Sequence, residues 1–435
     1  MLVADERGQA GGQYFKQPGQ GFDLDESKLD RQFSEGRSLA AAALTAGATM
    51  LTGATLWAAN IVDEAPELHF LIDGAAQAVC PKRVVLAMGA YERPWPVAGW
   101  TLPGVMTSGA AQTLLRAYQT APGKRVLIAG NGPLNLQVAR ELQRAGVDVV
   151  ALVEQAARPG PANLASAIRM ALNAPGLVRD GLAQLAALQG AGVPMLYRHV
   201  LTAVEGEGQA RRAVVGRIDA EGRVEATSRR SFDVDAVCLG YGFLPQSEAA
   251  RALGCRFAGD AGSYAVRDEN GRSSVATVFI AGDGGGLGGA RVSIAQGILA
   301  GGAAALDLAG VANGSEQHKA RRALERDGAF QKALWALYSP VPVVLDPEPK
   351  VLICRCEGVS AGTVAELLDG DVRDVGSLKR ARRIGMGACQ GRYCAPLIAS
   401  RLSLSQDGEL PGFAPRPPFK PMPISAIAGM NKVTA

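Results

Sequence analysis

Residues 125–154 read RVLIAGNGPLNLQVARELQRAGVDVVALVE, and this stretch decides the fold class. The apolar run at 125–129 predicts a buried strand, and Leu134, Val138 and Leu142 predict the apolar face of a helix over 134–145. Residues 147–153 predict a second buried strand. Two strands joined through a helix form a βαβ unit, the building block of parallel sheets. The sequence therefore predicts an α/β protein.

The turn of this unit carries a partial dinucleotide-binding motif. Gly130 and Gly132 form G-x-G, Asn135 replaces the third glycine, and Glu154 follows Gly130 by 24 residues. An acid at the end of the second strand hydrogen-bonds the ribose of a dinucleotide and favours NAD over NADP. We expect Gly130, Gly132 and Glu154 to form a second nucleotide site for NAD(P) or another nucleotide, which is left empty if the unit is only structural.

A second glycine motif, TVFIAGDGGGLGG, spans residues 277–289. A strand at 278–280 leads into Asp283, and a small-residue helix begins near Arg291. A carboxylate at that turn can accept a ribityl hydroxyl of FAD, while the helix N-terminus faces the pyrophosphate. The alternative is a glycine-rich loop in which Asp283 only caps the helix. The predicted FAD-binding residues of this stretch are Gly282, Asp283 and Gln296.

Two upstream stretches extend the flavin prediction. A short strand at 2–4 ends in two acids and is followed by a glycine loop, and a strand at 84–87 ends in a sharp turn. An acid at the end of the second strand of an FAD fold holds the adenosine ribose. An exposed N-terminal strand with an acidic end is the alternative. The further predicted FAD-binding residues are Asp5, Glu6, Gly11, Gly12, Gln13, Ala87 and Gly89.

Four cysteines near the C-terminus form C-x-C and C-x4-C pairs with 32 residues between the pairs. Four thiolates at two close spacings suit a [2Fe–2S] cluster, with one pair for each iron. Zinc is the rival, although zinc sites favour C-x2-4-C on both arms. The predicted metal ligands are Cys354, Cys356, Cys389 and Cys394.

The composition excludes several classes of function. The 435 residues hold 48% hydrophobic and 20% charged residues, and a formal charge of +4 does not indicate nucleic-acid binding. Three histidines make a histidine-centred hydrolase site improbable. We see no signal pattern and no apolar stretch of about 18 residues, so we expect a cytoplasmic protein without a transmembrane segment.

These motifs predict two interleaved Rossmann-like domains, one for FAD and one NAD(P)-like, followed by a small helical [2Fe–2S] domain. The FAD domain takes residues 1–119 and 235–312, and the NAD(P)-like domain takes residues 120–234. Residues 313–346, which are charged and then Pro-rich, form a linker to the [2Fe–2S] domain and C-terminal tail at 347–435. Within the second domain, 197–204 predict one strand, and 214–218 pair with 223–226 across a turn.

The chain resembles the FAD/[2Fe–2S] alpha-type subunits of heteromeric amine and amino-acid dehydrogenases. These include components of opine oxidase, hydroxyproline and proline dehydrogenases, hydrogen cyanide synthase and sarcosine oxidase. The resemblance covers nearly the whole chain and rests on DERGQAGGQYF, LAMGAYERPWPVAGWTLPGVM, VLIAGNGPL, TVFIAGDGGGLGG, CRCEGV, GMGACQGRYC and RPPFKPMPISAIAG.

The resemblance implies a pyridine nucleotide-disulfide oxidoreductase-like fold with a bacterioferritin-associated-ferredoxin-like [2Fe–2S] domain. Two departures stand out: Met88 replaces the usual Thr of the A-T-G turn, and the first G-x-G-x-x-G unit is absent. The resemblance therefore suggests an N-terminally truncated chain, and we expect this form to bind FAD weakly.

By resemblance, substrate oxidation takes place in a D-amino-acid-oxidase-like flavoprotein subunit, with or without a small ferredoxin-like subunit. This flavoprotein would then act in electron transfer as an oxidoreductase subunit of a heteromeric complex, carrying electrons from an opine-, hydroxyproline- or sarcosine-like substrate to an acceptor. We see no positioned catalytic base in the chain itself. The alternatives are a stand-alone NAD(P)H-dependent flavin reductase and a non-enzymatic, zinc-stapled scaffold.

Overall fold

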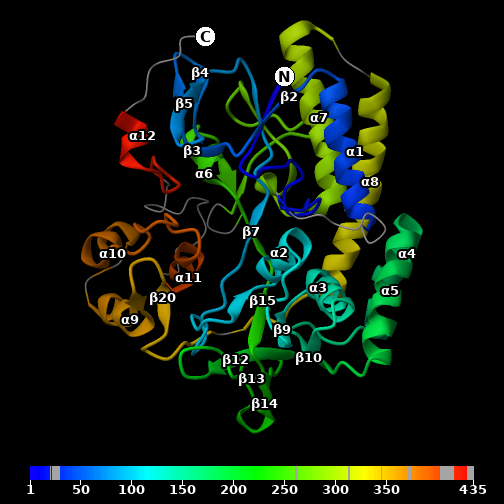
Figure 1. Ribbon diagram of the computed structural model, residues 1–435, viewed down its shortest axis with the longest axis vertical. Coiled ribbons are helices and arrows are strands. Elements are labelled where there is room, and N and C mark those ends of the chain that lie inside the picture. Colours follow the sequence, from blue (N-terminus) through cyan, green and yellow to red (C-terminus); the bar gives the residue numbers. More distant parts are fainter. Residues whose placement is uncertain are drawn as a thin grey trace. The chain divides into compact units, whose positions relative to one another are not determined.

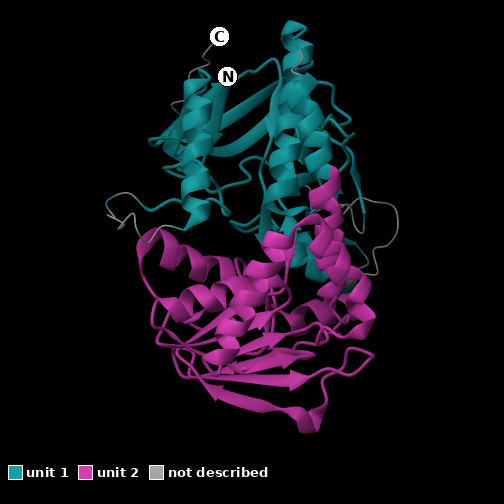
Figure 2. Ribbon diagram, turned by 90° about the vertical axis from the view of Figure 1, so that its right-hand side faces the viewer, with its two compact units in different colours: residues 1–91, 244–324, 372–435 teal, residues 92–243, 325–371 magenta. Residues whose placement is uncertain are grey.

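The computed structural model describes residues 1–19, 21, 30–259, 263–311, 314–343, 345–370, 372, 374–401 and 416–428. The chain divides into two compact units (Figure 2). Unit 1 comprises Met1–Tyr91, Leu244–Leu324 and Val372–Ala435. Unit 2 comprises Glu92–Phe243 and Glu325–Asp371. The predicted domain boundaries remain a prediction.

Unit 2 is built on a five-stranded parallel sheet in the order β11-β10-β9-β15-β8. Its central strands are continuous apolar runs, and Val126 to Ala129 are fully buried because both faces of the sheet are covered. The strands are β8 (Val105–Thr107), β9 (Arg125–Gly130), β10 (Asp148–Glu154), β11 (Met195–Tyr197) and β15 (Ala236–Gly240).

Two layers cover this sheet (Figure 1). On one face, residues of the helices α2 (Ser108–Tyr118), α3 (Pro133–Arg144) and α5 (Pro175–Gly190) pack into a core with the strands. On the other face lies an antiparallel sheet of β12 (His199–Glu205), β13 (Arg212–Arg217) and β14 (Arg230–Asp233). The predicted βαβ unit is confirmed, since β9 and β10 pair in parallel across α3.

The β-rich part of unit 2 differs from the expectation in two places. The strand predicted over 197–204 is divided into β11 and β12, because Arg198 adopts a φ of +53°. Residues 223–226 do not form a strand; a 3₁₀ helix, η3 (Ala226–Ser228), leads into β14, which pairs with β13. The remaining elements of unit 2 are η2 (Pro161–Asn163), α4 (Leu164–Asn173), β20 (Leu352–Cys354), β21 (Val359–Ser360) and α9 (Ala361–Asp369).

Unit 1 contains two separate parallel strand pairs. β1 (Leu2–Asp5) pairs with β2 (Thr49–Thr52), and β6 (Val84–Leu86) pairs with β19 (Val278–Ile280). An antiparallel sheet of β3 (Thr55–Val62), β4 (Ala65–Ile72) and β5 (Ala75–Val79) packs in one core with β6, β19 and α6 (Glu248–Ala252). The other elements of unit 1 are α1 (Arg31–Thr45), β17 (Phe257–Ala258), β18 (Tyr264–Ala265), η4 (Gly282–Gly285), α7 (Gly289–Ala309), α10 (Val375–Arg382), α11 (Cys394–Arg401) and α12 (Ile424–Ala428).

Helix α7 is the one described helix that is long and apolar enough to cross a membrane, by length and composition alone. The expectation of no such segment therefore fails for this helix. Ala300, Ala303 and Ala304 pack against Phe279 and Ala281, at β19 and directly after it. The helix is thus packed in the core of unit 1, and a core helix meets the same criterion.

The chain crosses between the units at the short strands β7 (Ala90–Glu92) and β16 (Phe243–Pro245), and again within α8 (Gly314–Leu337). Residues 313–346, which we expected to act as a linker, are therefore mainly helical. The apolar side chains of Phe330 and Ala333 are buried against Met170 and Ala174 of the α4–α5 hairpin. This burial explains why a charged segment forms a long helix.

Candidate cofactor sites

The flavin motif of unit 1 lies where β6 and β19 end. Leu86 pairs with Ile280, and the Ala281 N–H donates to the Leu86 carbonyl at 2.9 Å. Ala87 and Gly89 therefore lie at the same sheet edge as Gly282 and Asp283. The carboxyl ends of parallel strands are where α/β sheets bind ligands.

Asp283 organises the glycine turn. Its Oδ1 accepts hydrogen bonds from the backbone N–H groups of Gly288 at 2.9 Å and Gly289 at 3.2 Å, at the start of α7. Within the described ranges, Oδ2 makes no hydrogen bond. One carboxylate oxygen therefore caps the helix and the other is available to a ribityl hydroxyl, so the cap and the flavin interpretations are compatible.

The backbone around Asp283 fits a bound cofactor. Gly282 has a φ of +69°, and its N–H donates to Oε1 of Gln296 at 3.0 Å. A Cβ built on Gly89 or on Gly286 would meet nothing within 4 Å. Glycines beside open space allow a ligand to approach the main chain closely. The residues of this edge therefore fit the isoalloxazine and ribityl side of FAD.

The predicted N-terminal contacts lie at the end of β1. Oδ1 of Asp5 accepts the Arg7 N–H at 2.9 Å, and Glu6 forms an ion pair with Lys420. The glycine loop is tight, since Phe15 N–H donates to the Gly11 carbonyl at 3.1 Å. Gly12 also has a positive φ, and Gln13 is exposed in the turn that follows. These five predicted residues belong to a different strand pair from Asp283.

Arg267 is a flavin-site residue that the sequence did not reveal. Its guanidinium donates to the carbonyls of Ile280 at 3.0 Å and Gly282 at 3.2 Å. Burial lowers the pKa of Arg267, and the carboxylate of Asp283 opposes that shift. A lone arginine in an irregular segment carries no motif, so only the folded chain identifies it.

The second glycine turn, in unit 2, is closed by hydrogen bonds within the chain. Oε2 of Glu154 accepts the Gly132 N–H at 3.0 Å, and Oε1 accepts the Ala156 N–H at 3.0 Å. Burial raises the pKa of this carboxyl to about 7, against the effect of those backbone donors. Asn135 donates from Nδ2 to the Gly240 carbonyl at 2.9 Å and thereby joins the turn to β15.

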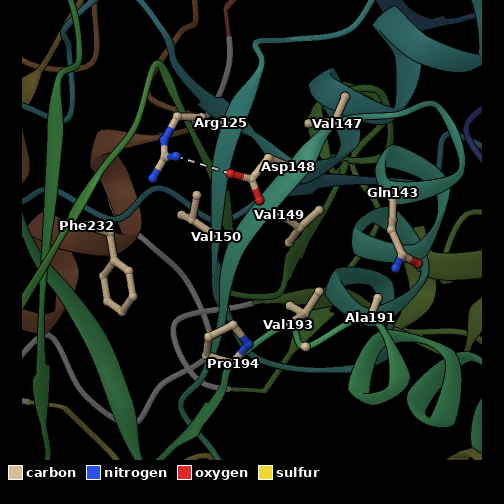
Figure 3. Close-up of a pocket in the computed structure, with 11 residues that line it drawn as sticks. Arg125, Gln143, Val147, Asp148, Val149, Val150, Ala191, Val193, Pro194 and Phe232 are labelled. Atoms are coloured by element: carbon tan, nitrogen blue, oxygen red, sulfur yellow. Dashed lines mark ion pairs between the residues drawn. The ribbon is translucent and has the colours of Figure 1, made fainter.

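A cavity of about 370 Å³ lies at the opposite edge of this sheet (Figure 3). Arg125 and Asp148, the first residues of β9 and β10, form an ion pair at 3.4 Å in its wall. Its lining includes none of Gly130, Gly132 and Glu154. Since nucleotides bind at the carboxyl ends of the strands, this cavity is not the predicted nucleotide site.

The cysteine pairs belong to different units. Cys354, which is buried, ends β20, and Cys356 is exposed in the turn after it, in unit 2. Cys389 is half-buried in a turn and Cys394 is the buried first residue of α11, in unit 1. Within the described part of the chain, no three His, Cys, Asp or Glu side chains form a metal-binding group.

The donor chemistry of these cysteines nevertheless fits an iron–sulfur cluster. None of the four forms a disulfide within the described residues. The Arg392 N–H donates to the Cys389 carbonyl at 3.2 Å, so the second pair sits on a tight turn that leads into a helix. Backbone N–H groups at such junctions can hydrogen-bond cluster sulfurs. The assignment of the four cysteines as ligands remains a prediction.

Comparison with known proteins extends this interpretation to the whole chain. Residues 24–297 match the pyridine nucleotide-disulphide oxidoreductase family, and residues 352–403 match the BFD-like [2Fe–2S] binding domain. The second match covers all four cysteines. The first match indicates FAD and the second a [2Fe–2S] cluster, which confirms both cofactor predictions.

Named relatives agree with these matches. The first of two opine oxidase subunits, from Rhizobium meliloti (strain 1021), is 34% identical over 361 residues, which cover 80% of this chain and 76% of the relative. Hydrogen cyanide synthase subunit HcnB of Pseudomonas aeruginosa is 32% identical, over 85% of this chain and 79% of its own. The crystal structure of L-proline dehydrogenase from P. horikoshii shares the fold, with a TM-score of 0.66 and 19% identity over 98% of this chain and 74% of that one.

Fold, glycine motifs and relatives converge on one class of redox protein. The chain therefore belongs to the pyridine nucleotide-disulphide oxidoreductase family, as an FAD-dependent oxidoreductase that also carries a BFD-like [2Fe–2S] domain and is related to a subunit of opine oxidase.

Proposed function

We propose that this chain is the electron-transfer subunit of a heteromeric amine or amino-acid dehydrogenase. A flavoprotein partner of the D-amino-acid-oxidase type removes two electrons from an opine-, hydroxyproline- or sarcosine-like substrate, and this chain passes them to an acceptor in the cytoplasm. A flavin accepts two electrons together and an iron–sulfur cluster passes them singly, so the two cofactors join a two-electron donor to a one-electron acceptor. The presence of both cofactor domains in one chain is the observation that carries the proposal.

In this proposal the described residues hold and orient the cofactors. Asp283 and Gln296 fix the glycine turn against the ribityl chain, and Arg267 supports the carbonyls of that turn. Cys354, Cys356, Cys389 and Cys394 provide the thiolates of the cluster. Asp5, Glu6, Gly11, Gly12, Gln13, Ala87 and Gly89 complete the FAD contacts.

An exposed apolar face supports a partner protein. On α4, Leu164, Ile168 and Leu172 follow one another at helical spacing and are 63%, 51% and 79% exposed. Leu182 on α5 is 60% exposed. Such rows on a protein surface mark binding sites for other macromolecules. The named relatives are themselves called subunits, so the flavoprotein partner is the occupant that we propose.

The partner is tested by copurification of this chain with the flavoprotein encoded beside it. We expect the pair to oxidise an amine or amino-acid substrate with an artificial acceptor, and the isolated chain to be inactive. Ile168→Asp should weaken copurification at least tenfold, because it places a charge in the apolar row. Val62→Asp, at a 45% exposed aliphatic residue of β3, is the matched control. Rapid turnover by the isolated chain would contradict the proposal, and lipid-vesicle binding that Ile168→Asp abolishes would reassign the face to a membrane.

A further inference from the structure

The second glycine turn is covered by the chain's own residues. The Nδ2 of Asn131 donates to the Tyr338 carbonyl at 2.9 Å, and the Nε2 of Gln155 donates to the Val341 carbonyl at 2.7 Å. The Trp335 ring would lie 3.6 Å from a Cβ built on Gly132. All these residues belong to unit 2. The end of α8 and the extended segment after it therefore lie on the turn itself.

This cover lies where a dinucleotide would bind. In a nucleotide-binding βαβ unit the pyrophosphate lies at the glycine turn and the acid at the end of the second strand holds a ribose. Here Gly132 faces Trp335, while Glu154 is only 5% exposed and lies near Tyr338. Both carboxylate oxygens of Glu154 already accept backbone hydrogen bonds. The polar groups that would recognise the nucleotide are thus engaged within the chain.

The covering segment stays attached to unit 2 as far as the first cysteine pair. We call residues 335–352 the strap. The Pro342 carbonyl would lie 1.7 Å from a Cβ built on Gly222, and Val341, Val343 and Leu345 pack against the core of unit 2. The Nε1 of Trp100 then donates to the Leu352 carbonyl at 3.0 Å, two residues before Cys354.

We propose that the strap is an internal occupant of the second dinucleotide site, which it closes to pyridine nucleotides. The glycine motif has in this way become an anchor for the chain, and it determines donor specificity: electrons do not enter from NADH or NADPH through this unit. The strap also fixes Cys354 and Cys356 against unit 2, a consequence that rests on the proposed ligand role of these cysteines.

The first test is a nucleotide titration of the full chain in its FAD- and cluster-loaded form. Calorimetry with NADH, NADPH and NAD should detect no binding up to millimolar concentration. Micromolar binding of any of these nucleotides would overturn the proposal. This readout does not depend on the partner protein or on the cluster ligands, so it separates a failure of the strap from a failure of the proposed function.

The second test measures amide hydrogen exchange in residues 335–352. The double variant Asn131→Ala/Gln155→Ala removes two side-chain donors to the strap, and we expect exchange there to rise about tenfold or more. Asn173→Ala is the matched control, because Asn173 also donates from its side-chain amide to a backbone carbonyl in unit 2, at 2.8 Å. Strap amides that already exchange at unprotected rates in the unsubstituted chain, or equally in all variants, would refute the anchor. The flavin-to-protein ratio and the far-ultraviolet spectrum verify that each variant is folded.

Discussion

Asp283 holds α7 with one carboxylate oxygen and leaves the other for the cofactor, so its two roles can be separated. Asp283→Ala removes the cap on Gly288 and Gly289, and it should cost about 1 kcal/mol of unfolding free energy as well as flavin affinity. Asp283→Asn keeps an oxygen acceptor for the cap. It should retain most of the stability and still bind FAD about tenfold more weakly.

The flavin-to-protein absorbance ratio after desalting and a urea unfolding curve measure these two effects. Equal flavin retention by the unsubstituted chain and both variants would show that Asp283 is only a helix cap.

Glu154 predicts a pH dependence of stability. Burial raises its pKa from 4.5 to about 7. A carboxyl whose folded pKa exceeds its unfolded pKa contributes stability that is complete below about pH 4.5 and lost as the pH rises through about 7. The loss amounts to about 3 kcal/mol at most. Glu154→Gln removes the titration, so its unfolding free energy should fall less between about pH 5 and pH 8.

Urea unfolding of both proteins across that range checks the slope. Parallel curves for the unsubstituted chain and Glu154→Gln would show that Glu154 does not titrate there.

At the scale of elements, the sequence predicts what local chemistry determines. The unit β9–α3–β10 is correct nearly to the residue, because apolar runs and a glycine turn specify it. The strand break at Arg198 was missed, since its positive φ has no local signal. Helix α8 was missed for a different reason: its apolar face is defined by packing against α4 and α5, which lie far away in the sequence.

Glycines of the same unit provide a contrast in the cost of a methyl group. A Cβ on Gly130 would lie 2.1 Å from the Gly240 carbonyl oxygen, so Gly130→Ala should cost about 3 kcal/mol or more. Gly146, which ends α3 with a φ of +81°, has nothing within 4 Å of that position. Gly146→Ala should therefore cost only the backbone strain, about 1–2 kcal/mol. Chemical unfolding compares the two, and equal losses would contradict the close contact between β9 and β15.

At the scale of the whole molecule, the sequence predicted both cofactors and the α/β fold from motifs alone. It could not identify Arg267, nor predict that Trp335 and Tyr338 cover the second glycine turn, because these contacts join segments between 13 and about 200 residues apart. A motif shows that a nucleotide site has the right backbone. Only the fold shows whether another part of the chain lies in it.

The cluster prediction extends over both units, and it is tested by substitution. Cys389→Ser should abolish the visible charge-transfer bands and the rhombic EPR signal of the reduced cluster while FAD remains bound, because a [2Fe–2S] cluster requires four ligands. Cys80→Ser, at an exposed cysteine outside the quartet, should preserve both signals. Stoichiometric zinc without iron in anaerobically purified protein would refute the ligand assignment.

Anaerobic reduction of the complex with its flavoprotein partner, followed by visible and EPR spectroscopy, tests the central claim most directly. We predict that an amine or amino-acid substrate bleaches the flavin and produces the EPR signal of the reduced [2Fe–2S] cluster, whereas NADH and NADPH produce neither. Flavin bleaching by NADH in this chain alone would contradict the account and identify a self-sufficient reductase.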